Sequence, residues 1–399
     1  MSSPAPVIDA SGVRVYAGDC VDVMRALPEC GIDAVLTDPP YGIRVMGEAW
    51  DAPGIVERAS RGRATSPMPQ GIGGPRGGYR SEATEAGRYA QTASANRAFQ
   101  EWVSLWAGEC MRLLKPGGYL LAFGGSRTIH RLAAGIEDAG AEIRDGIVWL
   151  NGEGFPKSLD VARAVGAHLG DTAPMSSATT AASAQWQGWG TSLKPSFELC
   201  VVARKPLAGT VAENVLSHGT GAMHIDACRI QIQQPGESDA GPGRWPTNVL
   251  LAEEAARALD DGAPESVSRR GKPRASKRPG DGWGMTFTGA EYDDRGGPSR
   301  FFPVFRYARK ASSSERPTVG GVAHPTVKPL DLMRWLVRLV ARRGATVLDP
   351  FAGSGTTLEA CVIEGMDAIG IEKEESYMPL IEARLGKPVM QTLDLGGIA

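Results

Sequence analysis

Two short segments near opposite ends of this 399-residue chain constrain its fold most strongly. Each is an apolar run that ends in an aspartate and continues into turn-forming residues: LTDPPYGI at 36–43 and VLDPFAGSGTT at 347–357. Apolar runs of this length, bounded by Pro and Gly, are typical of buried strands. In an open α/β sheet, ligands bind where the carboxyl ends of parallel strands meet. We therefore expect Asp38 and Asp349 at one edge of a common sheet.

Strand and helix patterns alternate along much of the chain, which predicts an α/β fold with a doubly wound, mostly parallel sheet. The expected strands cover residues 13–19, 32–38, 119–125, 147–150, 198–205, 346–349 and 367–372. The expected helices cover residues 20–29, 97–114, 329–344 and 358–364. One face of the 97–114 helix should be core rather than ligand site; it carries Phe99, Trp102, Val103, Trp106, Cys110 and Leu113.

Two segments lack this periodicity. Residues 44–96 are rich in Gly, Arg, Ser and Pro, and a loop of this length beside the DPPY segment is interpreted as a flap over the site. Residues 206–323 are interpreted as an inserted recognition module, with a structural elaboration that binds no partner as the alternative. The module contains the basic run RRGKPRASKR at 269–278, which is either a solvated loop or a contact for nucleic acid.

Bulk composition sets weaker limits on function. The formal net charge is −2, so only a local basic patch would favour a nucleic-acid partner. The sequence has no run of about 18 apolar residues and no secretory leader pattern, so we expect an intracellular, cytoplasmic protein without a membrane span. Six scattered cysteines form no CxxC pair, which favours free thiols over disulfides or a zinc ribbon.

The segment Asp38-Pro39-Pro40-Tyr41 has the properties of a base-binding turn. Proline restricts the residue before it to extended geometry and removes a backbone donor, so the turn is stiff and presents acceptors. The Asp38 carboxylate and a backbone carbonyl complement an aromatic exocyclic amine, whose lone pair is otherwise delocalised. Tyr41 can stack on the base. Such a site would position the amine and stabilise the positive charge that develops on its nitrogen. The alternative is a proline turn capped by an aspartate.

The segment near the carboxyl terminus indicates a nucleoside site. It lacks both the G-K-[ST] of a phosphate-binding loop and the G-x-G-x-x-G of a dinucleotide fold. It offers an acid at a strand end (Asp349), an aromatic ring (Phe351) and close backbone approach at Gly353 and Gly355. Glu372 ends the next strand, where an acid can bind ribose hydroxyls.

With these motifs in place, the chain resembles the amino-group DNA methyltransferases that use S-adenosylmethionine. The resemblance covers most of residues 13–385 and rests on four segments: GDC at 18–20, LTDPPYG, AHPTVKPLDLMRWLV and DPFAGSGTT. The order, with the catalytic motif first and the cofactor motif last, is that of the β group. It implies a circularly permuted, Rossmann-like sheet: residues 1–205 as the catalytic half, 206–323 as target recognition and 324–399 as the cofactor-binding half.

The resemblance also implies a role for each matching residue. Asp38, Pro39, Pro40 and Tyr41 would hold the target base, with Asp38 also at the cofactor. Asp19 would bind the cofactor adenine and Glu372 its ribose. The rest of the cofactor site would be formed by Asp349, Phe351, Gly353, Ser354, Gly355, Thr356, His324, Thr326 and Lys328.

Duplex DNA is the partner that the family resemblance implies. A base inside the duplex must be flipped out to reach such a pocket, so the protein needs phosphate contacts around it. The candidates are flap arginines (Arg58, Arg61, Arg63, Arg76, Arg80) and the basic run, which consists of Arg269, Arg270, Lys272, Arg274, Lys277 and Arg278.

Two alternatives to this function remain open from sequence. Adenine N6 is the expected target because cytosine-N4 members of the family often carry Ser in place of Asp38, but the same chemistry serves cytosine N4. A hypothesis from another functional class is that the protein is a DNA-binding regulator with a vestigial cofactor site. His218, His224, Asp226 and Cys228 match no standard zinc spacing, so no metal is expected. A homodimer is reasonable on the resemblance.

Overall fold

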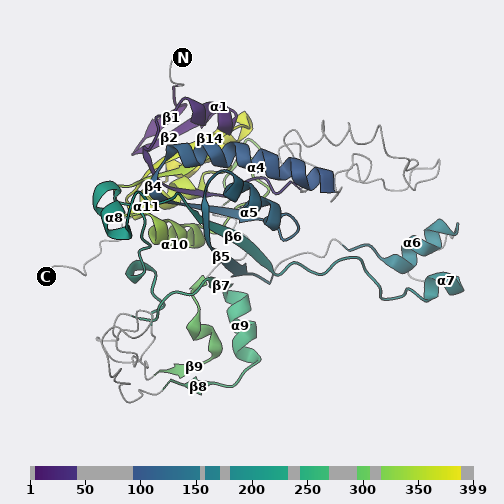
Figure 1. Cartoon of the computed structure of the whole chain (residues 1–399). Coiled ribbons are helices and arrows are strands. Elements are labelled where there is room, and N and C mark those ends of the chain that lie inside the picture. Colours follow the sequence, from purple (N-terminus) through teal and green to yellow (C-terminus); the bar gives the residue numbers. More distant parts are fainter. Residues whose placement is uncertain are drawn as a thin grey trace.

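The computed structural model describes residues 5–42, 93–152, 158–170, 180–231, 243–268, 294–305 and 316–387. Figure 1 shows a twisted sheet covered by helices, an arm that carries α6 and α7, and a lobe around α9. The N-terminal and C-terminal parts of the chain contribute neighbouring strands to the sheet, as the doubly wound α/β prediction requires. The predicted fold class is confirmed.

Within the described ranges, the main sheet has ten strands. In spatial order they are β1 (Ile8–Ala10), β2 (Val13–Ala17), β14 (Asp367–Glu372), β13 (Thr346–Asp349), β3 (Ile32–Thr37), β4 (Leu114–Gly124), β6 (Phe197–Arg204), β5 (Glu142–Leu150), β7 (Val249–Ala252) and β10 (Val304–Phe305). The pairs along β2-β14-β13-β3-β4 are parallel, as are β5-β7 and β7-β10. β6 runs antiparallel to both β4 and β5.

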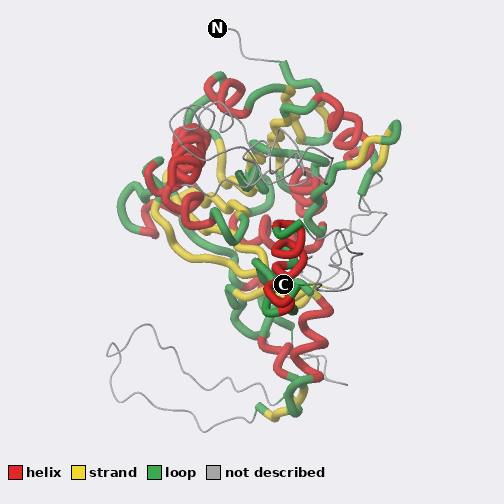
Figure 2. The backbone as a smooth tube through the Cα atoms, turned by 90° about the vertical axis from the view of Figure 1, so that its right-hand side faces the viewer, coloured by secondary structure: helices red, strands yellow, loops and turns green. Residues whose placement is uncertain are grey.

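Helices cover both faces of the sheet and form two apolar cores, visible in Figure 2 as helices on either side of the strands. One face packs against α1 (Cys20–Arg25), α4 (Ala93–Leu113) and α5 (Ile129–Asp138). The other packs against α10 (Leu330–Val340), α11 (Thr356–Glu364) and α12 (Met378–Leu385). Successive residues of β3 alternate between the cores, with Val35 in the first and Leu36 in the second. A strand buried on both faces reads as a continuous apolar run, because neither face needs polar residues.

This topology places the ends of several strands at one edge. Because β2, β14, β13 and β3 are parallel, the residues that end or follow them lie along the same side of the sheet: Asp19, Glu372, Asp349 and Asp38. β6 runs the other way, so it begins at this edge and brings its second residue, Glu198, toward Asp38.

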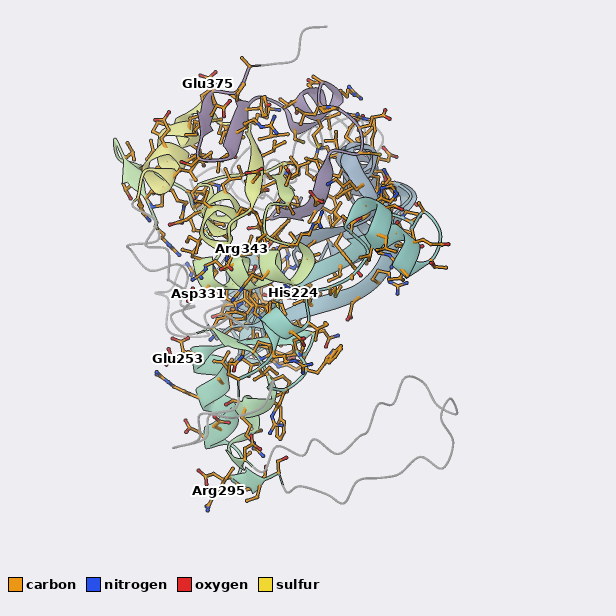
Figure 3. The ribbon with its side chains drawn as sticks, turned by 90° about the vertical axis from the view of Figure 1, so that its left-hand side faces the viewer. His224, Glu253, Arg295, Asp331, Arg343 and Glu375 are labelled. Carbon is orange, nitrogen blue, oxygen red and sulfur yellow. The ribbon has the colours of Figure 1, made fainter. Side chains whose placement is uncertain are left out.

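The remaining elements extend from this framework. α6 (Val161–His168) and α7 (Ala181–Ala184) lie between β5 and β6 and form the arm, while α8 (Val211–His218) packs near β4. The lobe contains α9 (Glu253–Asp261), the short strands β8 (Ser266–Val267) and β9 (Arg295–Gly296), and the 3-10 turn η4 (Pro298–Phe301). Figure 3 shows Arg295 at the tip of this lobe and Glu375, of the turn η5 (Glu375–Tyr377), at the opposite end of the molecule. The turn η3 (Asp226–Cys228) packs on α10, and β11 (Thr318–Val319) pairs with β12 (Val322–Ala323).

Several predicted boundaries differ from the structure. The helix predicted at 20–29 ends at Arg25, and the one predicted at 329–344 spans Leu330–Val340. The strands predicted at 119–125 and 147–150 span Leu114–Gly124 and Glu142–Leu150. α4 begins at Ala93, so residues 93–96 of the predicted flap are helical; these residues precede the apolar face that marked the helix in the sequence. β7 and β10 join the main sheet although they lie within the predicted insertion 206–323. The division of the chain into three parts therefore stays a prediction, and residues 43–92 lie outside the described residues.

The packing of α4 gives a stability prediction. Trp106 is fully buried under the sheet, and its ring meets that of Phe351 edge to face at 5.5 Å. We expect Trp106→Ala to lower the free energy of unfolding by about 3–5 kcal/mol, because it removes the largest apolar contact of the helix and leaves a cavity. Urea denaturation measures this. The neighbouring Leu105 is 52% exposed, and Leu105→Ala should change stability by less than about 0.5 kcal/mol. Equal effects would refute this account.

Candidate active site

A cavity of about 280 Å³ lies at the edge where β2, β3, β13 and β14 end. It brings together twelve of the residues that the sequence analysis singled out, from segments more than 300 positions apart in the chain. They are Asp19, Asp38, Pro40, His324, Thr326, Lys328, Asp349, Phe351, Gly353, Ser354, Thr356 and Glu372. This convergence follows from the parallel strand order, because each strand delivers its following loop to the same edge.

The glycine-rich loop between β13 and α11 forms one wall. Gly353 and Gly355 have φ of +54° and +81°, a region that side chains other than glycine rarely adopt. A Cβ at Gly353 would come within 3.0 Å of the His324 ring, so the loop also needs the missing side chain for space. Buried Arg384 of α12 fixes the loop by donating from Nε to the carbonyl of Ser354 at 2.9 Å and by pairing with Glu359. The backbone is thereby held close to the cavity.

Two buried carboxylates ending neighbouring strands carry raised pKa values. Glu372 accepts hydrogen bonds from the amides of Gly353 at 2.7 Å and Glu374 at 2.8 Å, yet burial raises its pKa to about 7. Burial likewise raises the pKa of Asp349 to about 6, although it accepts a 2.7 Å hydrogen bond from the Thr37 hydroxyl. Desolvation outweighs these hydrogen bonds in both cases. A ligand that brings donors or positive charge would stabilise both anions.

The charges on the cavity wall are predominantly negative. Among the described residues, five acidic side chains line it against two lysines and one imidazole, that of His324. Burial lowers the pKa of His324, which favours its neutral form. The acids are Asp19, Asp38, Asp349, Glu372 and Glu374, and the lysines are Lys328 and Lys373. The excess of carboxylates suits a ligand with positive charge.

The segment that leads into α10 closes the cavity from the other side. His324 Nδ1 lies 2.5 Å from the carbonyl oxygen of Thr326, and the His324 ring meets Tyr377 edge to face at 4.7 Å. Four residues further on, Lys328 extends its ammonium group away from this ring pair and toward β3. The segment thus contacts both the glycine-rich loop and the DPPY turn.

At the DPPY turn, the Asp38 carboxylate is held by two donors. The Tyr41 hydroxyl donates to Oδ1 at 2.9 Å, and Lys328 Nζ donates to Oδ2. Lys328 Nζ also lies 3.2 Å from Glu198 Oε2 and 3.2 Å from the Tyr41 oxygen. Burial opposes the charge on Lys328, but Asp38 and Glu198 outweigh it and leave its pKa above the ordinary value. Burial, reinforced by the same two carboxylates, raises the pKa of Tyr41, which stays a neutral donor.

Some residues differ from their sequence-based placement. Trp102 was interpreted as core, but it lines the cavity and packs against Phe351 at 5.7 Å, because it lies at the border of the buried face of α4. Sequence reasoning missed Tyr377 and Glu198, neither of which belongs to a recognisable motif. Among the described residues, Pro39, Tyr41 and Gly355 stand behind the cavity wall rather than on it. The proposed DNA-contacting residues 269–278 and the flap arginines lie outside the described residues.

The candidate metal ligands do not converge. Cys228 is buried against Trp335 of α10, with Sγ 3.6 Å from the Trp335 carbonyl, while Asp226 pairs with Arg229 at 2.8 Å. Within the described ranges, no group of three or more His, Cys, Asp or Glu side chains could hold a metal ion. All six cysteines are free thiols. None of the helices in the described part of the chain is long and apolar enough to cross a membrane.

Comparison with known proteins finds several DNA-modifying methyltransferases that are similar to this chain. The Type II methyltransferase M.HindIII of Haemophilus influenzae is 25% identical over 380 residues, which cover 93% of this chain and 94% of the relative. The Type II methyltransferase M.MjaI of Methanocaldococcus jannaschii is 34% identical over 109 residues, which cover 23% of this chain and 36% of that protein. The solved structure of the cytosine-N4-specific PvuII DNA methyltransferase, 13% identical, aligns with a TM-score of 0.48 over 97% of this chain and 91% of its own.

A family model described as DNA methylase, for N6 and N4 methyltransferases, matches residues 32–383. The match includes both the DPPY turn and the glycine-rich loop, which the fold brings to one cavity. Because it spans most of the chain, the protein belongs to this family of DNA methylases and uses S-adenosylmethionine as its methyl donor.

Proposed function

We propose that the protein methylates the N6 amine of an adenine flipped out of duplex DNA. The observation that carries the proposal is the position of Asp38, whose carboxylate lines the cavity and is aligned by Tyr41 and Lys328. An acceptor fixed at this point can hold an aromatic amine next to the methyl donor. A vestigial site would not need to keep these donors on Asp38.

The cavity fits S-adenosylmethionine by charge and by its donor and acceptor groups. The sulfonium and ammonium groups of the cofactor are cationic, and the wall carries five acidic residues against two lysines. We propose that Glu372 binds the ribose hydroxyls and Asp19 the adenine amine, with Asp349 and Phe351 beside them. The glycine-rich loop (Gly353, Ser354, Gly355 and Thr356) and the segment with His324, Thr326 and Lys328 would enclose the remainder. When bound, the cofactor supplies an activated methyl group.

The protein's own residues would prepare the amine for attack. Asp38 accepts one amine N–H, and a backbone carbonyl of the Pro39-Pro40 turn accepts the other, which localises the nitrogen lone pair. The bound donor would supply its methyl group to this nitrogen, and the nitrogen would then give up one proton. Asp38 is the nearest acceptor for that proton and stabilises the positive charge before it leaves. Tyr41 would lie against the flipped base.

Adenine is favoured over cytosine by the identity of residue 38, as the family resemblance implies. The family resemblance associates Asp at this position with adenine N6 and Ser more often with cytosine N4. Both bases present an amine beside a ring-nitrogen acceptor, so the mechanism is the same for either. A nucleoside digest of duplex DNA treated with isotope-labelled S-adenosylmethionine separates them: label in N6-methyladenine is expected, and label in N4-methylcytosine would overturn the choice of base.

The first prediction tests the proposed role of Asp38. We expect Asp38→Ala to lower methyl transfer at least about 100-fold, because it removes the acceptor that aligns the amine. Cofactor and DNA binding should remain largely intact by calorimetry and gel shift. Asp331→Ala, at a carboxylate on α10 that is 57% exposed, should behave like the wild type. Turnover close to wild type in Asp38→Ala would sink the mechanism.

The second prediction concerns the pH dependence of cofactor binding. The pKa of Glu372 is about 7, and hydroxyl donors from a bound cofactor should lower it. Binding then favours the deprotonated form, so affinity falls as the pH drops through 7. The dissociation constant of S-adenosylmethionine should be about tenfold larger at pH 6 than at pH 8. Glu372→Gln should bind more weakly and lose most of this pH dependence, whereas Glu375→Gln should keep it. A flat profile for the wild type would contradict the assignment.

The third prediction addresses the basic run. If its six basic residues contact phosphates, replacing them with glutamine should weaken DNA binding and reduce the slope of log K against log salt by up to about 5. The residues are Arg269, Arg270, Lys272, Arg274, Lys277 and Arg278. Fluorescence anisotropy at several salt concentrations measures the slope. An unchanged slope would show that the run does not touch DNA.

A further inference from the structure

Glu198 lies beside the catalytic turn but belongs to none of the motifs that define the family resemblance. It is the second residue of β6, and β6 begins at the edge where the parallel strands end. Its side chain is one third exposed. Among the described residues, Glu198 is not part of the cavity wall, whereas Asp38 is. Glu198 therefore lies outside the cavity lining, in contact with Lys328, which is part of it.

Asp38, Tyr41, Glu198 and Lys328 form a cluster in which each N–H or O–H donor has an acceptor. Lys328 Nζ has three N–H donors, and three acceptors surround it: Asp38 Oδ2, Glu198 Oε2 at 3.2 Å and the Tyr41 oxygen at 3.2 Å. The Tyr41 hydroxyl donates to Asp38 Oδ1 at 2.9 Å, which is shorter than its 3.3 Å contact with Glu198. Phe123 adds its ring face, 4.7 Å from Lys328 Nζ. Glu198 thus shares both partners of Asp38.

The charges show why a second carboxylate matters here. Lys328 is only 8% exposed, so its field is weakly screened. Alone it would neutralise Asp38 and weaken that carboxylate as an acceptor for an amine on which positive charge develops. With Glu198 present, two carboxylates share one ammonium group and the cluster keeps one net negative charge. An electrostatic field of that sign stabilises the transition state more than the neutral ground state.

We propose that Glu198 is a positioning residue for methyl transfer: it shares Lys328 with Asp38, so that the catalytic carboxylate is held in place without being neutralised. The inference rests on the proposed function of Asp38 and adds a second acid to it. Glu198 need not touch the base, because it acts through Lys328 and Tyr41.

The test separates charge from shape. Glu198→Gln keeps the length of the side chain and an oxygen that can accept from Lys328, but it removes the negative charge. We expect the single-turnover rate constant to fall roughly 10- to 100-fold, while the dissociation constants of S-adenosylmethionine and duplex DNA change by less than about twofold. Glu198→Asp restores the charge with a shorter reach and should recover part of the rate.

The matched control uses the same pair of antiparallel strands, β5 and β6. Glu142 of β5 pairs with Arg204 of β6 at 2.6 Å, at the other end of the two strands. Glu142→Gln also removes a carboxylate from an ion pair, and it should leave the single-turnover rate unchanged. A wild-type rate in Glu198→Gln would overturn the proposal. So would an aspartate variant no faster than the glutamine variant, or a rate loss matched by an equal loss of cofactor affinity.

These measurements also distinguish a failure of this inference from a failure of the proposed function. If the wild-type protein places label in N4-methylcytosine, the choice of adenine is overturned. The ratio of the Glu198→Gln rate constant to the wild-type rate constant would still test the role of Glu198. If Asp38→Ala retains wild-type turnover, both proposals fail together. If Asp38→Ala is inactive and Glu198→Gln is fully active, the role of Glu198 alone is refuted.

Discussion

The direct pairing of β13 with β3 is the constraint on which the rest of the site depends. The two strands run parallel, with Val347 opposite Ala34 and Leu348 opposite Val35. Their following residues are therefore neighbours, and the Thr37 hydroxyl donates to Asp349 across the junction. One strand carries the proposed base-binding turn and the other the glycine-rich loop. Methyl transfer needs donor and acceptor in near contact, and this strand pair brings the proposed base-binding turn next to the glycine-rich loop.

The same arrangement concentrates carboxylates where burial disfavours their charge. Asp349 and Glu372 end adjacent strands, and desolvation raises both pKa values in spite of several hydrogen bonds. A fold selected for stability alone would avoid such groups, because each one costs free energy at neutral pH. A cationic cofactor with hydroxyl donors offsets that cost. The raised pKa values are therefore those expected of a binding site without its ligand.

The segment before α10 links the two halves of the site. His324 packs against Tyr377 beside the glycine-rich loop, and Lys328 reaches Asp38 and Glu198 on the other side. α10 is packed into the core behind them. The segment thus contacts both the glycine-rich loop and the proposed base-binding turn. In our proposal, Glu198 acts through Lys328 of this segment, and it does not line the cavity itself.

Much of this was determined by the sequence alone. The buried strands at 346–349 and 367–372 were predicted with the boundaries observed, because strands buried on both faces read as unbroken apolar runs. Asp38 and Asp349 could be singled out because turn-forming Pro and Gly follow each of them, whereas the roles of Asp19, His324, Thr326 and Lys328 were implied only by the family resemblance. Other features came only from the tertiary structure. Glu198 belongs to no motif; it approaches Asp38 because β6 runs against its neighbours. Trp102 looked like core from its spacing, yet it also borders the cavity. Local periodicity shows which face of an element is buried, but only the packed sheet decides what that face meets.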